Sequence, residues 1–303
     1  MPPAIYQPGA GAAFTLSAFG DEIDADLDTQ LRVMGELRIG FLELRAAWGT
    51  NVSDLDDRQV AAIKTACERS GVEVSCIGSP VGKSVITDPP ETDLDRLDRV
   101  LRVADALGTD RVRVFSFYPP GGGNGQQDRY LQEAISRLER MARRAEDDGI
   151  VLLLENEVGV MGDTPECCRS ILEAVDSPAL RFVWDTANFA VVGVTSATER
   201  GWPLLSPYLA HVQIKDFHIA DQIVCAAGEG DGQIPELLAR LRDAGYQGFL
   251  ALEPHLAVTG PAGGFSGPDG IGVAIRSLCR VLDYVGIDYS LRDFSDIQAA
   301  RGF

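Results

Sequence analysis

The sequence predicts an α/β fold, a single (β/α)8 barrel, from two observations. Short apolar runs alternate eight times along the chain with stretches whose apolar residues recur at helical spacing. The last four apolar runs each end in a side chain that can bind a metal ion: Glu155, Asp185, Gln213 and Glu253. Because the C-terminal ends of the strands hold the active site in such a barrel, we expect these four side chains to meet at one point.

The eight expected strands are short and largely apolar, as parallel strands buried on both faces are. They cover residues 14–20, 41–46, 72–78, 111–117, 151–155, 182–185, 211–215 and 249–253. A doubly wound open sheet is the competing arrangement, but it requires a glycine fingerprint after its first strand. The sequence SAFGDE at positions 17–22 is not such a fingerprint, so the barrel is favoured.

The expected helices follow the strands and carry recognisable start and stop signals. They cover residues 26–37, 57–70, 93–107, 128–148, a stretch that begins at 164, 202–209, 234–244 and 271–285. Gly71 and Gly108 stop the second and third helices, and Thr164-Pro165 provides a cap and a first-turn proline. The resulting division is an N-terminal tail (1–13), a barrel (14–286) and a C-terminal extension (287–303).

Composition limits the classes of partner. The formal net charge of −18 repels phosphate backbones and anionic membrane surfaces, so neither nucleic acid nor a membrane is an expected partner. No apolar stretch approaches membrane-spanning length, and the N-terminus lacks the features of a signal peptide. The six cysteines form no CxxC pair, which is typical of small buried side chains in a reducing cytoplasm. We therefore expect a cytoplasmic protein.

The four strand-end residues form an oxygen-rich ligand set. Three carboxylates and one amide oxygen suit a hard divalent cation, Mn²⁺ or Mg²⁺, with Co²⁺ as a further possibility. Any one of these residues is equally well explained as an ordinary polar strand end. Four in succession favour a metal site.

Several local motifs resemble one known group. These motifs are Glu-Asn-Glu at 155–157, Asp-Thr-Ala-Asn at 185–188, Lys-Asp at 215–216, the loop 228–231 and Glu-Pro at 253–254. Together they resemble the xylose-isomerase-like TIM barrels, over nearly the whole chain. That group includes sugar phosphate isomerases/epimerases, ketose 3-epimerases, inosose dehydratases and apurinic endonucleases. The motifs are specific for the superfamily but do not identify a substrate.

The resemblance implies roles for the strand-end residues. The family's metal ligands fall on Glu155, Asp185, Gln213 and Glu253, although most members carry a histidine where Gln213 stands. His211, two residues earlier on the same strand face, is the alternative ligand. In the epimerases that this chain resembles, the two ligand glutamates move the proton, which here means Glu155 and Glu253.

The expected function is a divalent-metal-dependent sugar isomerase or epimerase. It would act on a keto-sugar through proton abstraction next to the carbonyl and a metal-bound enediolate. The alternative is a metal-dependent lyase, either an inosose-type dehydratase or an enzyme that cleaves a 3-keto-glycoside by β-elimination. An apurinic endonuclease is excluded, because its trinuclear zinc site needs several histidines and the whole chain contains three. The expected partner is a small sugar, and a homo-oligomer is possible.

Other polar and aromatic residues near the strand ends are candidates for contacts with substrate. They are Arg45, Glu157, Asn188, Lys215, His255, Trp48 and Phe115. Five of them have a simpler explanation as well. Arg45 could pair with Glu43 or Asp21, Lys215 could pair with Asp216, Glu157 could be a solvated loop end, and the two aromatic residues could pack in the core.

Overall fold

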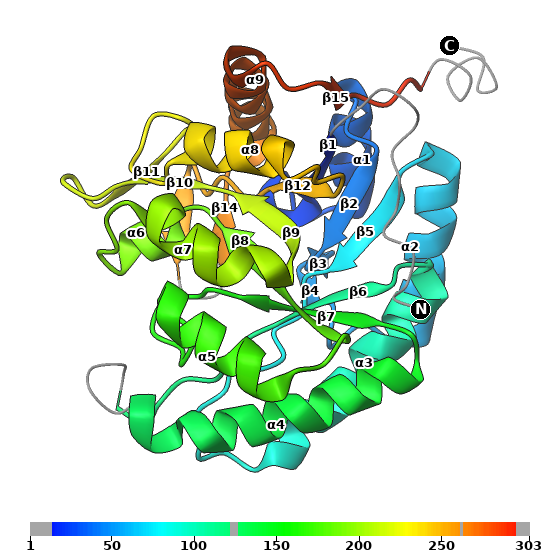
Figure 1. The fold of residues 1–303 in the computed structure, drawn as a ribbon. Helices are drawn as coiled ribbons and strands as arrows, with labels where there is room; N and C mark the ends of the chain where they lie inside the picture. Colours follow the sequence, from blue (N-terminus) through cyan, green and yellow to red (C-terminus); the bar gives the residue numbers. More distant parts are fainter. Residues whose placement is uncertain (1–13, 122–126, 261–262, 295–303) are drawn as a thin grey trace.

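The computed structural model describes residues 14–121, 127–260 and 263–294. Within these residues, eight parallel strands form a barrel that closes where the eighth pairs with the first. In order around the barrel they are β1 (Phe14–Phe19), β2 (Phe41–Leu44), β5 (Glu73–Ile77), β6 (Arg111–Val114), β7 (Val151–Glu155), β8 (Leu180–Asp185), β9 (Leu209–Ile214) and β12 (Phe249–Leu252). The predicted (β/α)8 barrel is confirmed (Figure 1).

Helices surround the strands and bury their apolar sides against the barrel. They are α1 (Leu27–Glu36), α2 (Asp57–Ser70), α3 (Pro90–Leu107), α4 (Gln127–Asp147), α5 (Pro165–Val175), α6 (Asn188–Val191), α7 (Ala197–Leu205), α8 (Ile234–Asp243) and α9 (Gly267–Val285). Gly71 and Gly108 end α2 and α3 in the left-handed conformation, as predicted. The helix expected at 202–209 begins and ends earlier, and the 3-10 turn η2 (Ser206–Tyr208) follows it.

Short hairpins follow three strands at the C-terminal mouth of the barrel. Strands β3 (Ala46–Ala47) and β4 (Thr50–Asn51) follow β2, and β10 (Asp216–His218) and β11 (Ile223–Cys225) follow β9. Strands β13 (Val258–Gly260) and β14 (Gly263–Phe265) follow β12, and the 3-10 turn η1 (Gly20–Glu22) follows β1. These additions build the walls of the mouth above the strand ends.

A polar layer crosses the barrel interior below its mouth. Glu43 is fully buried and accepts hydrogen bonds from the hydroxyls of Ser17 (3.0 Å) and Ser75 (2.6 Å). His211 is also fully buried, and its Nε2 lies 3.2 Å from Glu43 Oε1. Burial alone would raise the pKa of Glu43, but His211 and the two hydroxyls outweigh it and lower that pKa. Below this layer the rings of Phe41 and Phe249 pack with their centres 5.0 Å apart.

The C-terminal extension adds one short strand to the barrel. Strand β15 (Tyr289–Ser290) pairs in parallel with the start of β1, through Phe14 and Thr15. The predicted tail at 1–13 lies outside the described residues, and the division of the chain at residue 286 stays a prediction. Among the helices that the structure describes, none is both long and apolar enough to cross a membrane.

The expected fourth strand, 111–117, ends earlier than predicted, because another segment takes over its hydrogen bonds. Strand β6 ends at Val114, and the next residues pair with the loop after β5. The amide of Phe115 donates to Val81 O (2.8 Å), and that of Phe117 donates to Gly82 O (2.9 Å). Gly82 has φ +85°, and a Cβ there would lie 2.1 Å from the carbonyl oxygen of Phe115. Only glycine fits this crossing.

We therefore expect Gly82→Ala to lower the free energy of unfolding by at least about 2 kcal/mol, from positive φ and overpacking together. Urea unfolding followed by tryptophan fluorescence measures this. Gly35→Ala in α1 is the matched control, because a Cβ there meets nothing within 4 Å. It should change the unfolding free energy by no more than about 1 kcal/mol, in the stabilising direction. Equal effects in the two variants would contradict this account of the crossing.

Candidate metal centre and active site

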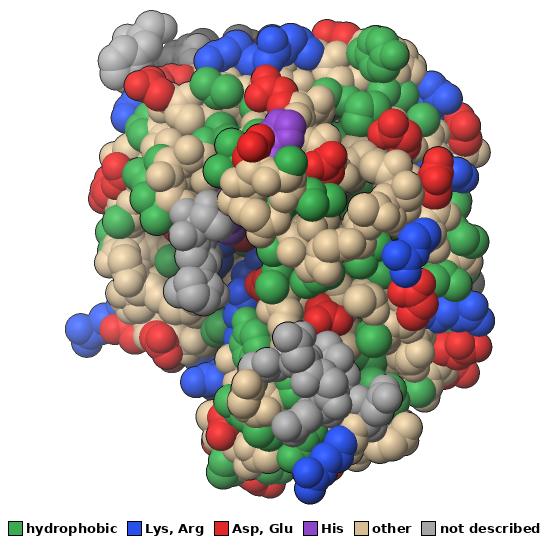
Figure 2. Space-filling view, turned by 90° about the vertical axis from the view of Figure 1, so that its left-hand side faces the viewer, with side chains coloured by type: hydrophobic (Ala, Val, Ile, Leu, Met, Phe, Trp, Pro, Cys, Tyr) green, Lys and Arg blue, Asp and Glu red, His purple; other side chains and the backbone are tan. Residues whose placement is uncertain are grey.

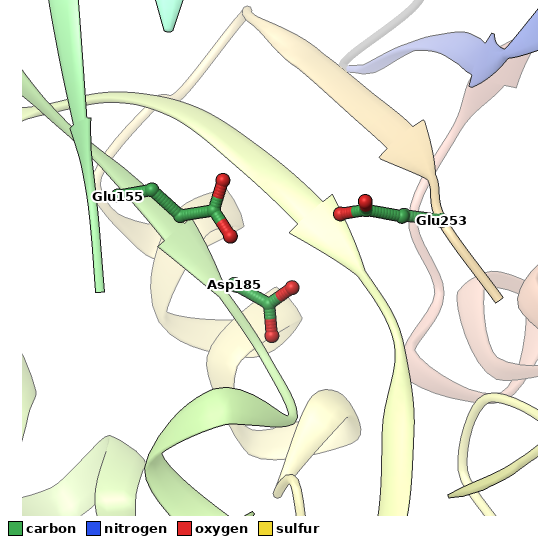
Figure 3. Close-up of side chains that lie close together, drawn as sticks. All are labelled: Glu155, Asp185 and Glu253. Carbon is green, nitrogen blue, oxygen red and sulfur yellow. The ribbon is translucent and has the colours of Figure 1, made fainter. Parts of the chain in front are cut away.

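Three buried carboxylates converge at the mouth of the barrel. Glu155 ends β7, Asp185 ends β8, and Glu253 follows β12. One oxygen of each lies within 4.8 Å of the others, and each side chain is at most 4% exposed. Figure 3 shows the three carboxylates directed toward one another from their separate strands. Such a cluster is electrostatically unfavourable unless cations balance it.

Gln213 fills the gap between these carboxylates along the sheet. It lies in register with Asp185 on one side and Ala251 on the other, and it is 1% exposed. Its Oε1 accepts no hydrogen bond, and the same holds for Glu155 Oε2, Asp185 Oδ2 and Glu253 Oε2. Four adjacent strands thus each bring one oxygen that accepts no well-aligned hydrogen bond, and two of these oxygens are in ion pairs; such an oxygen set fits a hard divalent cation.

The other carboxylate oxygens are held by the protein. Asp185 Oδ1 accepts the backbone amides of Ala187 (2.9 Å) and Asn188 (2.8 Å). Glu155 Oε1 accepts from Asn188 Nδ2 at 3.2 Å. Glu253 Oε1 accepts from Arg45 Nη1 at 2.5 Å. Each carboxylate is therefore oriented through one oxygen, while the second oxygen remains available for a ligand role.

Two cations form ion pairs with the second oxygens of Glu155 and Asp185. Arg113 Nη1 lies 3.1 Å from Glu155 Oε2 and 3.7 Å from Glu253 Oε1, and Lys215 Nζ lies 2.9 Å from Asp185 Oδ2. Burial would lower the pKa of Lys215, but the charge of Asp185 outweighs it and raises that pKa. Both side chains therefore stay charged and reduce the repulsion within the cluster.

The two glutamates have opposite pKa shifts. Burial raises the pKa of Glu155 to about 8, even though Arg113 opposes the shift. Burial would also raise the pKa of Glu253, but Lys215, His255 and Arg45 outweigh it and hold that pKa well below its usual value. Before any cation binds, Glu155 thus takes up a proton much more readily than Glu253 does.

Arg45 and His255 both contact Glu253, one of the proposed ligands. Arg45 donates hydrogen bonds to Asp21 (2.7 Å) and to Glu253. The ion pair with Asp21 that was the simpler expectation for Arg45 is therefore present, together with the contact to a proposed ligand. His255 Nε2 lies 3.1 Å from Glu22 Oε1 and 3.4 Å from Glu253 Oε1. Burial would lower the pKa of His255, but its hydrogen bonds to the two glutamates raise it. Both side chains therefore border the candidate site.

The structure gives Asn188, Lys215 and Glu157 partners within the site. Asn188 contacts Glu155 and Asp185, and Lys215 pairs with Asp185 rather than with Asp216. Glu157 is not a solvated loop end, because its Oε2 lies 2.5 Å from Lys83 Nζ. All three border the carboxylate cluster, and their contacts with substrate stay predictions.

His211, Trp48 and Phe115 lie differently from expectation. His211, the alternative ligand, meets Glu43 in the layer below and is not part of the carboxylate cluster, because residue 211 lies one pleat deeper than residue 213. Trp48 is 41% exposed on the turn between β3 and β4. Phe115 is fully buried, and Lys83 and Arg113 lie over its ring, so the expected apolar wall for a sugar is wrong for this residue.

Three charged residues near the cluster were not predicted as part of the site from the sequence. Glu22, Lys83 and Arg113 lie on η1, on the loop after β5 and on β6, far from one another in the chain. Arg113 is 4% exposed and Glu22 is fully buried. A charged residue inside an apolar strand, such as Arg113 between Val112 and Val114, was the one available signal.

This chain is similar to a known protein family and to a curated relative. The profile of the family described as "Xylose isomerase-like TIM barrel" matches residues 37–280. An uncharacterized protein of Methanocaldococcus jannaschii is 28% identical over 150 residues, which are 48% of this chain and 51% of that protein. The chain thus spans about half the length of this relative.

Solved structures share the fold at low identity. A D-tagatose 3-epimerase-like protein has a TM-score of 0.71 and 20% identity, covering 90% of this chain and 98% of its own. A probable 3-DHS dehydratase of Bacillus anthracis has a TM-score of 0.66 and 17% identity, covering 88% and 98%. A xylose isomerase-like TIM barrel protein of Mycobacterium smegmatis, in complex with magnesium, has a TM-score of 0.68 and 18% identity, covering 90% and 98%. At these identities the likeness concerns the fold alone.

The geometry of Gln213 leads to a prediction about metal affinity. Gln213→Ala should weaken Mn²⁺ binding by at least about tenfold, as measured by isothermal titration calorimetry. Loss of a residue that only supports a ligand already lowers metal affinity by about tenfold, and a direct ligand should matter at least as much. Gln213→His should retain binding. The control is His211→Asn, which should bind Mn²⁺ like the wild type, because His211 meets Glu43. Loss of binding in His211→Asn with a wild-type affinity in Gln213→Ala would reverse the assignment.

Proposed function

The chain belongs to the xylose isomerase-like TIM barrel family, and from that premise we propose that it is a divalent-metal-dependent isomerase or epimerase of a keto-sugar. The observation that carries the proposal is the convergence of Glu155, Asp185 and Glu253, together with the Gln213 oxygen that has no donor. One neighbour in fold is described as a D-tagatose 3-epimerase-like protein and another was solved with magnesium, which supports the reaction class and the cation.

The cation would be held by Glu155, Asp185, Gln213 and Glu253, whose oxygens suit Mn²⁺ or Mg²⁺ and could also accept Co²⁺. When bound, it would supply Lewis-acid stabilisation of the negative charge that forms on the substrate oxygens. The cluster offers oxygen ligands and contains no cysteine. Such a ligand set favours hard cations over softer ones.

In this proposal Glu155 and Glu253 move the proton. They lie on the two flanks of the site, because β8 and β9 separate β7 from β12 in the sheet. One carboxylate takes the proton from the carbon next to the carbonyl, which leaves an enediolate. Return of a proton to the opposite face epimerises that carbon, and return to the neighbouring carbon isomerises the sugar. Arg45, His255 and Asn188 hold the two carboxylates in place.

The charge around the site supports a divalent cation. Six carboxylates face four Lys or Arg side chains and His255. When all six are ionised, as cation binding requires of the ligands, negative charge is in excess by one or two, depending on the proton of His255. The carboxylates are Asp21, Glu22, Glu155, Glu157, Asp185 and Glu253, and the cations are Arg45, Lys83, Arg113 and Lys215. One divalent ion brings the site close to neutrality and leaves it able to accept the negative charge of an enediolate.

The substrate that fits best is an unphosphorylated sugar. A phosphate group needs cations that are free to bind it. Each of Arg45, Arg113 and Lys215 is paired with a carboxylate of the site. A cytoplasmic location and a homo-oligomer stay predictions.

A lyase is the second candidate, and His255 favours it. Elimination of a β-hydroxyl or of an aglycone needs a proton donor beside the base, and His255 lies 3.4 Å from Glu253. One neighbour in fold is described as a probable 3-DHS dehydratase and another as a 3-keto-D-glucoside 4-epimerase. The same ligand set serves both reactions, so the product decides between them.

We expect Glu155→Gln and Glu253→Gln each to lower turnover by at least about 100-fold, because each removes a ligand charge and a base. The measurement is deuterium incorporation from D₂O into a panel of keto-sugars with Mn²⁺, followed by NMR. Glu68→Gln on the exposed face of α2 is the control and should match the wild type. A near wild-type rate in either variant would rule out the roles assigned here.

The same incubation separates the two reaction classes. An isomerase or epimerase places deuterium in an intact sugar, which is the expected result. A lyase instead releases water or an aglycone and leaves an unsaturated keto product, visible as a new vinyl proton signal. Such a product with no deuterated sugar would replace the first candidate with the second.

A further inference from the structure

Cations and aromatic rings alternate along one wall of the site. The guanidinium carbon of Arg45 lies 4.8 Å from the centre of the Phe19 ring, and that of Arg113 lies 5.1 Å from the same ring. Arg113 also lies 4.9 Å from the centre of Phe115, and Lys83 Nζ lies 4.5 Å from that centre. We call this series, Arg45–Phe19–Arg113–Phe115–Lys83, the cation–π series. It keeps three positive charges apart at defined positions.

Each cation of the series faces a different carboxylate. Arg45 binds Glu253, Arg113 binds Glu155, and Lys83 binds Glu157. The first two pairs are almost completely buried, with side chains no more than 6% exposed. The Lys83 and Glu157 side chains are 20% and 17% exposed. The series therefore runs from the buried ligands to one ion pair that solvent can reach, and Figure 2 shows Lys and Arg side chains inside a hollow of the surface.

The loop that carries Lys83 is firmly held. The Lys83 amide donates to Pro80 O at 2.9 Å. On either side of it, the Gly82 amide donates to Asp93 Oδ1 at 3.0 Å, and the Ser84 hydroxyl donates to Asp93 Oδ2. Asp93 is fully buried on α3. The backbone of Lys83 is thus fixed before any ligand arrives, as a residue that selects a ligand requires.

Glu157 joins this ion pair to the carboxylate cluster. It lies two residues after Glu155 at the end of β7. Lys83 and Arg113 both lie over the Phe115 ring, and Arg113 contacts Glu155. The Lys83–Glu157 pair therefore lies next to the proposed metal ligands and is more exposed than they are.

We propose that Lys83 and Glu157 form a subsite for two neighbouring hydroxyl groups on the part of a sugar that lies away from the reacting carbons. The inference rests on the proposed function and deepens it. Neighbouring hydroxyls match the pair chemically, because one donates a hydrogen bond to the carboxylate while the other accepts one from the ammonium group. Charged partners of this kind discriminate against substrates that lack these hydroxyls. Such a substrate would displace water from the pair without replacing the hydrogen bonds that the water made.

Two other ligands fit the pair less well. A phosphate or carboxylate would be repelled by Glu157, whose oxygen lies 2.5 Å from Lys83 Nζ. An apolar group has no surface to pack against there, because Phe115 is fully buried and Lys83 and Arg113 lie over its ring. A neutral polyol is the remaining match.

Binding is tested apart from turnover. Saturation-transfer NMR on the Mg²⁺-loaded protein measures xylitol binding by the wild type, Lys83→Met, Lys83→Arg and the surface control Lys64→Met. We expect Lys83→Met to weaken xylitol binding by at least about tenfold, the loss of a hydrogen bond to a charged group. Lys83→Arg should restore part of it, and Lys64→Met should match the wild type. Equal xylitol binding by wild type and Lys83→Met, or none by any form, overturns the inference.

Turnover then tests whether the subsite selects the substrate. The ratio of kcat/KM for D-fructose to that for dihydroxyacetone, from deuterium incorporation, should fall at least about tenfold in Lys83→Met. An equal loss for both sugars means a structural role and overturns the inference. If the wild type exchanges neither sugar, the proposed function is refuted, and the xylitol result still decides the subsite. Thermal unfolding of each variant confirms that the fold is intact.

Discussion

The mutual repulsion of three buried carboxylates is the constraint on which the rest of this site depends. Glu155, Asp185 and Glu253 bring their oxygens within 4.8 Å of one another in a region nearly closed to water. Removing a charge from water costs several kcal/mol even after the protein relaxes. Arg45, Arg113 and Lys215 offset part of that cost, and a divalent cation would offset the remainder. This balance of charge supports the proposed cation site.

The surrounding structure holds those compensating charges in place. Phe19 and Phe115 separate the cations through cation–π contacts, and the Glu43–His211 pair lies below the ligands inside the barrel. His255 has φ +51°, an unusual conformation for a residue with a side chain. Gly264 permits its position, because a Cβ there would lie 2.1 Å from the imidazole ring. Backbone strain and a close approach thus occur together beside Glu253, as is common at functional sites.

The ligand set by itself does not choose a reaction. Proton removal next to a carbonyl precedes epimerisation, isomerisation and elimination alike, and the same carboxylates serve all three. The choice depends on which proton donors and substrate contacts lie next to Glu155 and Glu253. In this chain those neighbours are His255 on one flank and the Lys83–Glu157 pair on the other. In this proposal the residues on the walls of the site select the substrate, whereas the carboxylates at the strand ends move the proton.

The barrel and the positions of the candidate ligands were predictable from the chain alone, because both follow from local patterns. An apolar run that ends in Glu155 or Asp185 places that side chain at a strand end, and parallel strands bring their ends to one edge. Only the tertiary structure decided that His211 meets Glu43, that Phe115 is covered by cations, and that Lys83 and Arg113 face the ligands. These contacts join residues distant in the chain, and a lone charged residue in a sequence gives no sign of its partner. Closure of the barrel brings these residues together, and no local sequence pattern indicates which of them will meet.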